Sequence, residues 1–109
     1  MLELIVEKSS NTIVRVDGIL SYATAEQVKD ELTAVLSTPE SSALWVDMTG
    51  VRFIDCAGLH SLFHVLSKAK RVGKDFVLCR IPPCVRLVLK MTGFTESFRI
   101  TDSIVPSSL

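Results

Sequence analysis

The 109-residue sequence lacks the features that mark a membrane protein or a secreted protein. No apolar run approaches the ~18 residues that a membrane-spanning helix needs. The first residues, Met1–Glu7, carry acidic side chains where a secretory signal peptide has basic ones. The three cysteines are an odd number and lie far apart, which suits a reducing compartment better than a disulfide framework. We therefore expect a cytoplasmic protein.

The motifs of common enzyme and cofactor sites are also missing. The chain has no P-loop, no GxGxxG, no GxSxG and no CxxC, and its five glycines lie between the expected elements. His60 and His64 have the spacing of two metal ligands on one helix, but the glutamate and the third ligand of an HExxH site are absent. No nucleophile with a base can be named. We expect no enzyme activity, no metal and no cofactor.

Neither sign of charge is in excess, with 12 basic and 12 acidic side chains. Residues 1–50 carry 3 basic and 8 acidic side chains, whereas residues 51–100 carry 9 and 3. Aromatic residues that would stack on bases do not interleave with the basic ones, so we expect no nucleic-acid partner. The basic residues form either a solvated surface or a surface for a protein partner. The charge split fits a monomer as well as a weak dimer. The closely spaced basic residues are Lys68, Lys70, Arg71, Lys74 and Arg80.

Strand and helix signals alternate along the chain. The second strand follows a turn at Ser9–Asn11 and ends at Asp17–Gly18, and Met48–Gly50 interrupts the third. Thr24 and Gln27 have the spacing of a capping box, and Gly93 is placed to end the last helix. The expected strands are residues 2–6, 12–16, 43–46 with 51–54, 75–79 and 97–100, and the expected helices are 25–36, 59–72 and 83–92.

This order predicts an α/β fold. Strands that alternate with helices form a mostly parallel sheet, and the two strands at the start form an antiparallel hairpin. We expect a mixed sheet flanked by about three helices, in a single domain over residues 1–109 with a loose tail at 105–109.

The connection Asp55–Leu59 is the segment with the strongest functional signal. It joins an apolar strand to an amphipathic helix, at the edge of an open α/β sheet where ligands and partners tend to bind. A purely structural explanation also fits, because Asp55 can cap the helix and Gly58 can allow a close turn. Periodicity does not decide between the two.

A longer segment around this connection resembles a known family. Residues 46–59 read VDMTGVRFIDCAGL, which is similar to the signature of STAS domains, the bacterial anti-sigma factor antagonists. The similarity extends over essentially the whole chain. Three further segments match the family: Val16–Leu20, Gly73–Phe76 and Met91–Phe94.

The resemblance implies a binding module that contacts an anti-sigma factor, often itself a serine kinase with an ATPase fold, and so releases a sigma factor. In the family, the kinase phosphorylates a serine directly before the glycine of the signature, which is Gly58 in this sequence. The phosphate breaks the complex. Here that residue is Ala57, and Cys56 precedes it. We expect partner binding without phosphate control at this position, with Ser21 and Ser61 as nearby alternative acceptors. The expected partner surface comprises Asp17, Ser21, Thr24, Asp55, Cys56, Ala57, Gly58, Leu59 and Ser61.

The cysteines suggest an alternative function. Cys56 lies in the family's switch loop, directly before Ala57, and both Cys56 and Cys84 lie at helix starts, where the backbone dipole favours a thiolate. Oxidation of Cys56 would add bulk and polarity there. Cys79 lies within an apolar strand and is expected to be inert. The alternative is a redox- or ligand-sensing module within a larger regulatory assembly.

Overall fold

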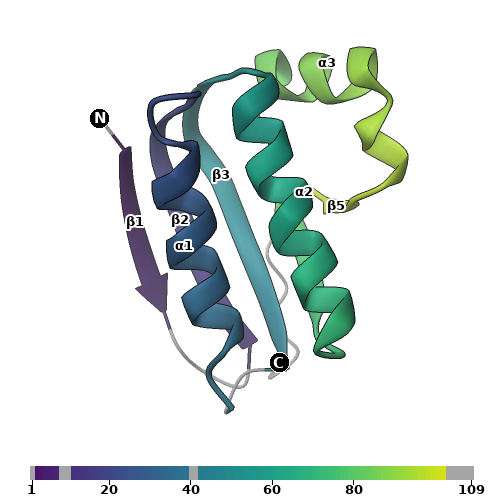
Figure 1. Ribbon diagram of the computed structural model, residues 1–109. Helices are drawn as coiled ribbons and strands as arrows, with labels where there is room; N and C mark the ends of the chain where they lie inside the picture. The colour runs from purple at the N-terminus through teal and green to yellow at the C-terminus, as the bar shows by residue number, and fades with distance from the viewer. Residues whose placement is uncertain (1, 8–10, 40–41, 103–109) are drawn as a thin grey trace.

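The computed structural model describes residues 2–7, 11–39 and 42–102, and its strands form one five-stranded sheet (Figure 1). The expected tail at 105–109 and most of the expected turn at 9–11 lie outside these residues. The elements are, in chain order, β1 (Leu2–Glu7), β2 (Asn11–Leu20), α1 (Ala25–Leu36), β3 (Ala43–Ile54), α2 (Cys56–Arg71), β4 (Asp75–Cys79), α3 (Pro83–Thr92), a 3₁₀ turn η1 (Phe94–Glu96) and β5 (Arg99–Thr101).

The sheet has the order β1-β2-β3-β4-β5 and mixes both pairing directions. β1 pairs antiparallel with β2, and the other three pairs are parallel. Helices connect the parallel pairs, as such crossovers require. The predicted mixed sheet, N-terminal hairpin and three helices are therefore confirmed.

Two expected strand ends are wrong. β2 continues through Asp17 and Gly18 to Leu20, and β3 runs unbroken across Met48–Gly50 to Ile54. The pairing of β2 with β3 shifts register between Arg15 and Asp17 and again between Gly18 and Ile19. Such irregularities accommodate turn-favouring residues without ending the ladder. The last strand also begins later than expected, at Arg99, because Ser97 caps the 3₁₀ turn η1.

Helix boundaries follow the capping residues closely. Thr24 occupies the N-cap of α1 as expected, but the capping box with Gln27 does not form. α2 begins at Cys56, three residues before the expected start, because Asp55 caps it. Pro83 is the first residue of α3, and Gly93 follows the helix in the left-handed conformation with φ of 80°.

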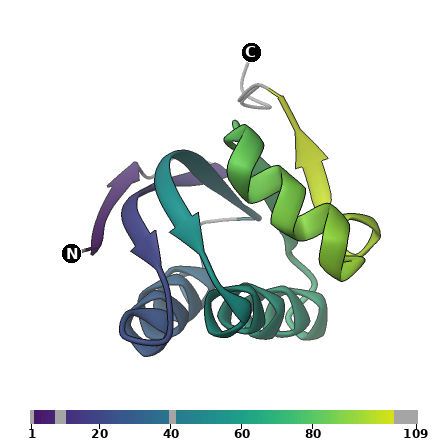
Figure 2. The ribbon, with the colours of Figure 1, turned by 90° about the horizontal axis from the view of Figure 1, so that it is seen from above.

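The main core lies between the sheet and the helices. α1 and α2 lie side by side on one sheet face (Figure 2), and α3 contacts β3 and the turn η1. The α2 face predicted to be apolar points inward, although Phe63 remains partly exposed and packs its ring against Phe94, with centroids 5.7 Å apart. The largest fully buried side chains are Leu20, Leu32, Leu36, Leu44, Met48, Leu59, Leu62, Leu78 and Leu89.

The start of α2 lies directly against the end of β2. The backbone N–H of Asp55 donates to the carbonyl oxygen of Leu20 at 3.0 Å. A Cβ atom added to Gly58 would overlap that same carbonyl group. Because only glycine fits this approach, Gly58 determines how near the first turn of α2 comes to the loop that follows β2.

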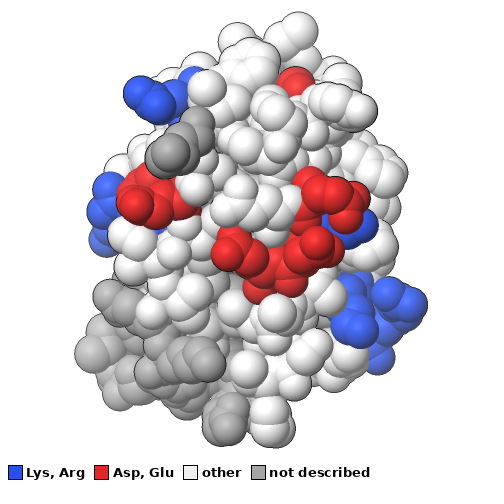
Figure 3. All heavy atoms as spheres, turned by 60° about the vertical axis from the view of Figure 1, so that its left-hand side comes forward, with Lys and Arg blue, Asp and Glu red and all other residues white. Residues whose placement is uncertain are grey.

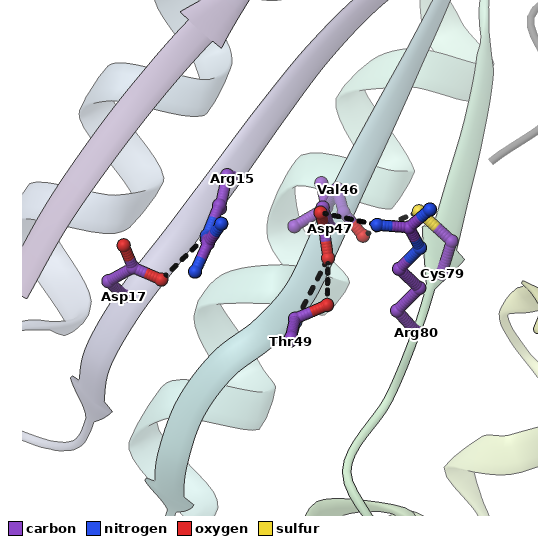
Figure 4. A network of polar contacts seen from close by, with 7 residues as sticks. All are labelled: Arg15, Asp17, Val46, Asp47, Thr49, Cys79 and Arg80. Carbon is purple, nitrogen blue, oxygen red and sulfur yellow. Dashed lines mark hydrogen bonds and ion pairs between the residues drawn. The ribbon is translucent and has the colours of Figure 1, made fainter. Parts of the chain in front are cut away.

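The opposite sheet face carries a small polar network (Figure 4). Asp47 is only 5% exposed, and its Oδ1 accepts hydrogen bonds from the N–H and hydroxyl of Thr49 at 3.0 and 2.6 Å. Its Oδ2 lies 3.8 Å from the Arg80 guanidinium. The buried Cys79 thiol donates to the carbonyl oxygen of Val46 at 3.3 Å. Burial, with a smaller contribution from the negative charge of Asp47, raises the pKa of Cys79 to about 11.

Replacing Gly58 with alanine is expected to destabilise the fold by about 1–3 kcal/mol, because backbone atoms must move. Gly50→Ala is the matched control. A Cβ at Gly50 meets mainly the carboxylate end of Asp17, which can rotate away, and lies 3.1 Å from the Asp17 Cα, so the expected loss is smaller, about 1 kcal/mol. Chemical denaturation of both variants measures the difference. Equal losses would contradict the role assigned to the α2–β2 contact.

The raised pKa of Cys79 makes stability depend on alkaline pH. The unfolded thiol loses its proton near pH 8.5, and the folded one only at about 11, so the folded state retains the proton in between. The contribution is complete below the unfolded pKa and is lost as pH rises towards the folded value. The stability of wild type relative to Cys79→Ala should fall by about 2–2.5 kcal/mol from about pH 8 to 10.5. Denaturation curves at each pH measure the free energy of unfolding of both proteins. A difference between them that does not change with pH would contradict the prediction.

Candidate functional site

Asp55 connects two segments at the edge of the sheet where the parallel strands end. It is the N-cap of α2, and its Oδ1 accepts a hydrogen bond from the Gly58 N–H at 2.9 Å. Its Oδ2 accepts from the N–H of Tyr22, in the β2–α1 loop, at 3.0 Å. The structural explanation for Asp55 is thus confirmed. The same carboxylate also holds the β2–α1 loop beside the first turn of α2. The loop and the helix start can therefore form one composite surface, made of two segments distant in sequence.

The β2–α1 loop is held by its own hydrogen bonds as well. The Thr24 hydroxyl donates to the carbonyl oxygen of Ile19 at 2.6 Å and accepts from the N–H of Ser21 at 3.0 Å. The Ser21 hydroxyl accepts from the N–H of Ala23 at 3.3 Å. Two of the expected site residues, Ser21 and Thr24, therefore shape the loop, and both are partly exposed.

A groove of about 570 Å³ lies between α1 and α2. At the end of the groove where α2 begins, Cys56 is exposed and Ala57 is partly exposed. On the α1 side of the groove, Lys29 and Glu26 form an ion pair across one helical turn, with a distance of 3.1 Å between the charged atoms. The groove is lined by Ala25, Glu26, Lys29, Cys56, Ala57, His60, Ser61 and His64.

The structure brings together only some of the expected site residues. Gly58 and Leu59 are buried beneath the first turn of α2. Asp17 lies on the sheet face opposite the two helices, where it pairs with Arg15 at 3.0 Å (Figure 4). This ion pair raises the pKa of the Arg15 guanidinium above its usual range. The exposed part of the candidate site is the β2–α1 loop together with Asp55, Cys56 and Ala57.

Ser61 is a poor acceptor for a phosphate. Its side chain is 4% exposed, and its hydroxyl donates to the carbonyl oxygen of Gly58 at 2.7 Å. Ser21 is more accessible, but its hydroxyl oxygen is already the acceptor for the Ala23 N–H.

Sequence reasoning missed Tyr22, which lies at the centre of this loop. The turn-like sequence around it predicts no element, and a single tyrosine carries no periodicity signal. Its backbone N–H is bound by Asp55, while the residue as a whole is 86% exposed. An aromatic residue two positions before the helix cap Thr24 was the signal available in the sequence.

The expected basic cluster of the second half is divided in the structure. Arg80 lies on the opposite sheet face beside Asp47. The Lys74 ammonium donates to the carbonyl oxygens of Leu36 and Thr38, at the end of α1, at 2.5 and 2.6 Å. Only Lys68, Lys70 and Arg71 remain together, in the last turn of α2.

Acidic side chains instead gather on the side formed by α1 and β1 (Figure 3). The exposed acids of α1 are Glu26, Asp30 and Glu31, and Glu26 also lines the groove. The α1 wall of the groove thus carries the Glu26–Lys29 ion pair, while the α2 wall carries His60 and His64.

Metal and membrane sites find no support in the described residues. Among them, no three histidine, cysteine or acidic side chains are grouped to hold a metal ion. Nor does any helix in the described ranges have the length and apolar character to cross a bilayer. The three cysteines form no disulfide; Cys84 is exposed, with its Sγ 3.8 Å from the carbonyl oxygen of Arg52.

Known proteins are similar to this chain in sequence and in fold. BtrV of Bordetella bronchiseptica, assigned as an anti-sigma factor antagonist, is 28% identical over 103 residues, which cover 94% of this chain and 88% of that protein. An anti-sigma factor antagonist from Mycobacterium paratuberculosis has a similar structure, with a TM-score of 0.84 and 23% identity, over 95% of this chain and 88% of the other.

The fold is not restricted to antagonists. A sulfate transporter family protein from Wolinella succinogenes matches with a TM-score of 0.75 and 23% identity, over 92% of this chain and 83% of the other. The fold alone therefore does not assign a function. The model of the STAS domain family matches residues 4–105. This chain belongs to the STAS domain family.

Proposed function

We propose that the chain is an anti-sigma factor antagonist: it binds an anti-sigma factor in the cytoplasm and so releases a sigma factor for transcription. Family membership and the likeness to BtrV support this proposal. The observation that carries it is the composite surface, in which the Asp55 carboxylate joins the β2–α1 loop to the exposed start of α2. A surface fixed in advance loses little conformational entropy on binding.

The proposed antagonist acts without a phosphate switch at its usual position. Ala57 has no hydroxyl to accept phosphate, and Ser61 is buried. A phosphate at position 57 would bring a charge of about −1.5 to −2 next to the Asp55 carboxylate, and repulsion and desolvation would oppose binding. Without it, binding depends on the amount of the protein or on another signal. Anti-sigma factors with a serine-kinase ATPase fold remain the proposed partners.

Ala57→Glu is expected to weaken partner binding by about 30-fold or more, since it places a negative charge in the interface beside Asp55. Ala34→Glu is the matched control, because Ala34 is exposed on α1 and does not line the groove. Tagged wild type and both variants are used to capture proteins from host lysate, and mass spectrometry identifies the proteins captured.

Titration calorimetry with the purified anti-sigma factor then gives the affinities. Capture by wild type and Ala34→Glu, but not by Ala57→Glu, is the expected result. Equal capture by all three would move the interface elsewhere. Failure of wild type to bind an anti-sigma factor would refute the proposed function.

One observation favours the redox alternative as a second candidate. Cys56 is exposed at the start of α2 and lines the groove, so a modified thiol would alter the proposed surface. Cys79, by contrast, is buried with a pKa of about 11. We expect iodoacetamide to label Cys56 in the native protein far faster than Cys79, as followed by peptide mass spectrometry. Equally slow labelling of the two would exclude redox sensing at Cys56.

A further inference from the structure

Tyr22 is the most exposed large hydrophobic side chain in the part of the chain that the structure describes. It is 86% exposed, compared with 76% for Met91, which is next in order. Single exposed apolar residues are common on protein surfaces. Tyr22 differs because its backbone is bonded to Asp55, the N-cap of the helix whose first residues, Cys56 and Ala57, line the α1–α2 groove.

The backbone of Tyr22 is fixed although its ring is free. Its N–H is bound by Asp55, and the residues on both sides are held by Thr24 and Ser21. Tyrosine has only two side-chain torsions, so ordering it in a complex costs little entropy. A rigid backbone under an exposed aromatic ring is the usual character of an anchor residue, since tyrosine is enriched among the residues that dominate binding energy.

Small side chains line the α1–α2 groove where the two helices begin. Ala25 begins α1, and Cys56 and Ala57 begin α2. Small residues allow the main chain of a partner to approach closely. The surface therefore combines an exposed tyrosine with small side chains at the starts of the two helices.

The charge around this surface also restricts the partner. The exposed surface of α1 carries Glu26, Asp30 and Glu31, although Glu26, the only one of them that lines the groove, is paired there with Lys29. Complementary partner surfaces place basic side chains opposite such exposed acids. An acidic partner surface would be repelled at the same position.

We propose that Tyr22 is the anchor of the antagonist surface and inserts into an apolar pocket on the anti-sigma factor, with basic side chains of that partner facing the exposed acids of α1. This inference rests on the proposed function. It adds a binding residue outside the segment that carries the switch in the family, and it gives the partner a definite chemistry.

The test compares wild type, Tyr22→Ala, Tyr22→Phe and Met91→Ala in titrations with the purified anti-sigma factor. Tyr22→Ala should bind about 30-fold more weakly, while Tyr22→Phe, which keeps the ring, should stay within about threefold of wild type. Met91→Ala removes a similarly exposed apolar side chain from α3 and should change affinity by less than about twofold. All four should melt at similar temperatures, because both side chains project into solvent.

The outcomes separate this inference from the proposed function. If Tyr22→Ala binds like Met91→Ala while Ala57→Glu abolishes binding, the anchor is refuted and the antagonist function stands. If Tyr22→Phe loses as much as Tyr22→Ala, an apolar pocket for the ring is refuted. If wild type binds no anti-sigma factor, both proposals fail together.

Discussion

The contact between the start of α2 and the end of β2 determines the geometry of the candidate site. One carboxylate, that of Asp55, accepts from Gly58 in its own helix and from Tyr22 in a loop distant in sequence. Its backbone donates to Leu20, whose carbonyl group leaves no space for a Cβ at Gly58. Helix capping and loop positioning are thus the same interaction. A substitution that weakens the Asp55 helix cap therefore also disturbs the loop and the exposed surface around Ala57.

The order of the elements follows from apolar patterning, whereas some of their ends do not. Helical spacing correctly orients α2, because three of its leucines meet the core. Gly18 and Gly50 favour turns locally, yet both lie inside strands, where pairing between β2 and β3 outweighs local preference. Bulges of this kind depend on the partner strand, so a single segment of sequence carries no signal for them.

The site could be predicted from the sequence only where it is contiguous. Asp55 and Ala57 lie in one short segment and share one surface. Tyr22 joins them through a hydrogen bond that only the folded chain reveals, and Asp17 lies on the other face of the sheet. Charge counts were also a poor guide to the surface. Arg80 and other basic side chains of the second half are engaged in contacts within the domain.

Lys74 has a consequence for how the domain meets a partner. It bonds the end of α1 from the segment that follows α2, while Asp55 joins the loop before α1 to the start of α2. The two helices are therefore linked at both ends, and the width of the groove between them is set before any encounter. The domain then acts as a rigid template, and conformational adjustment on binding falls to the partner.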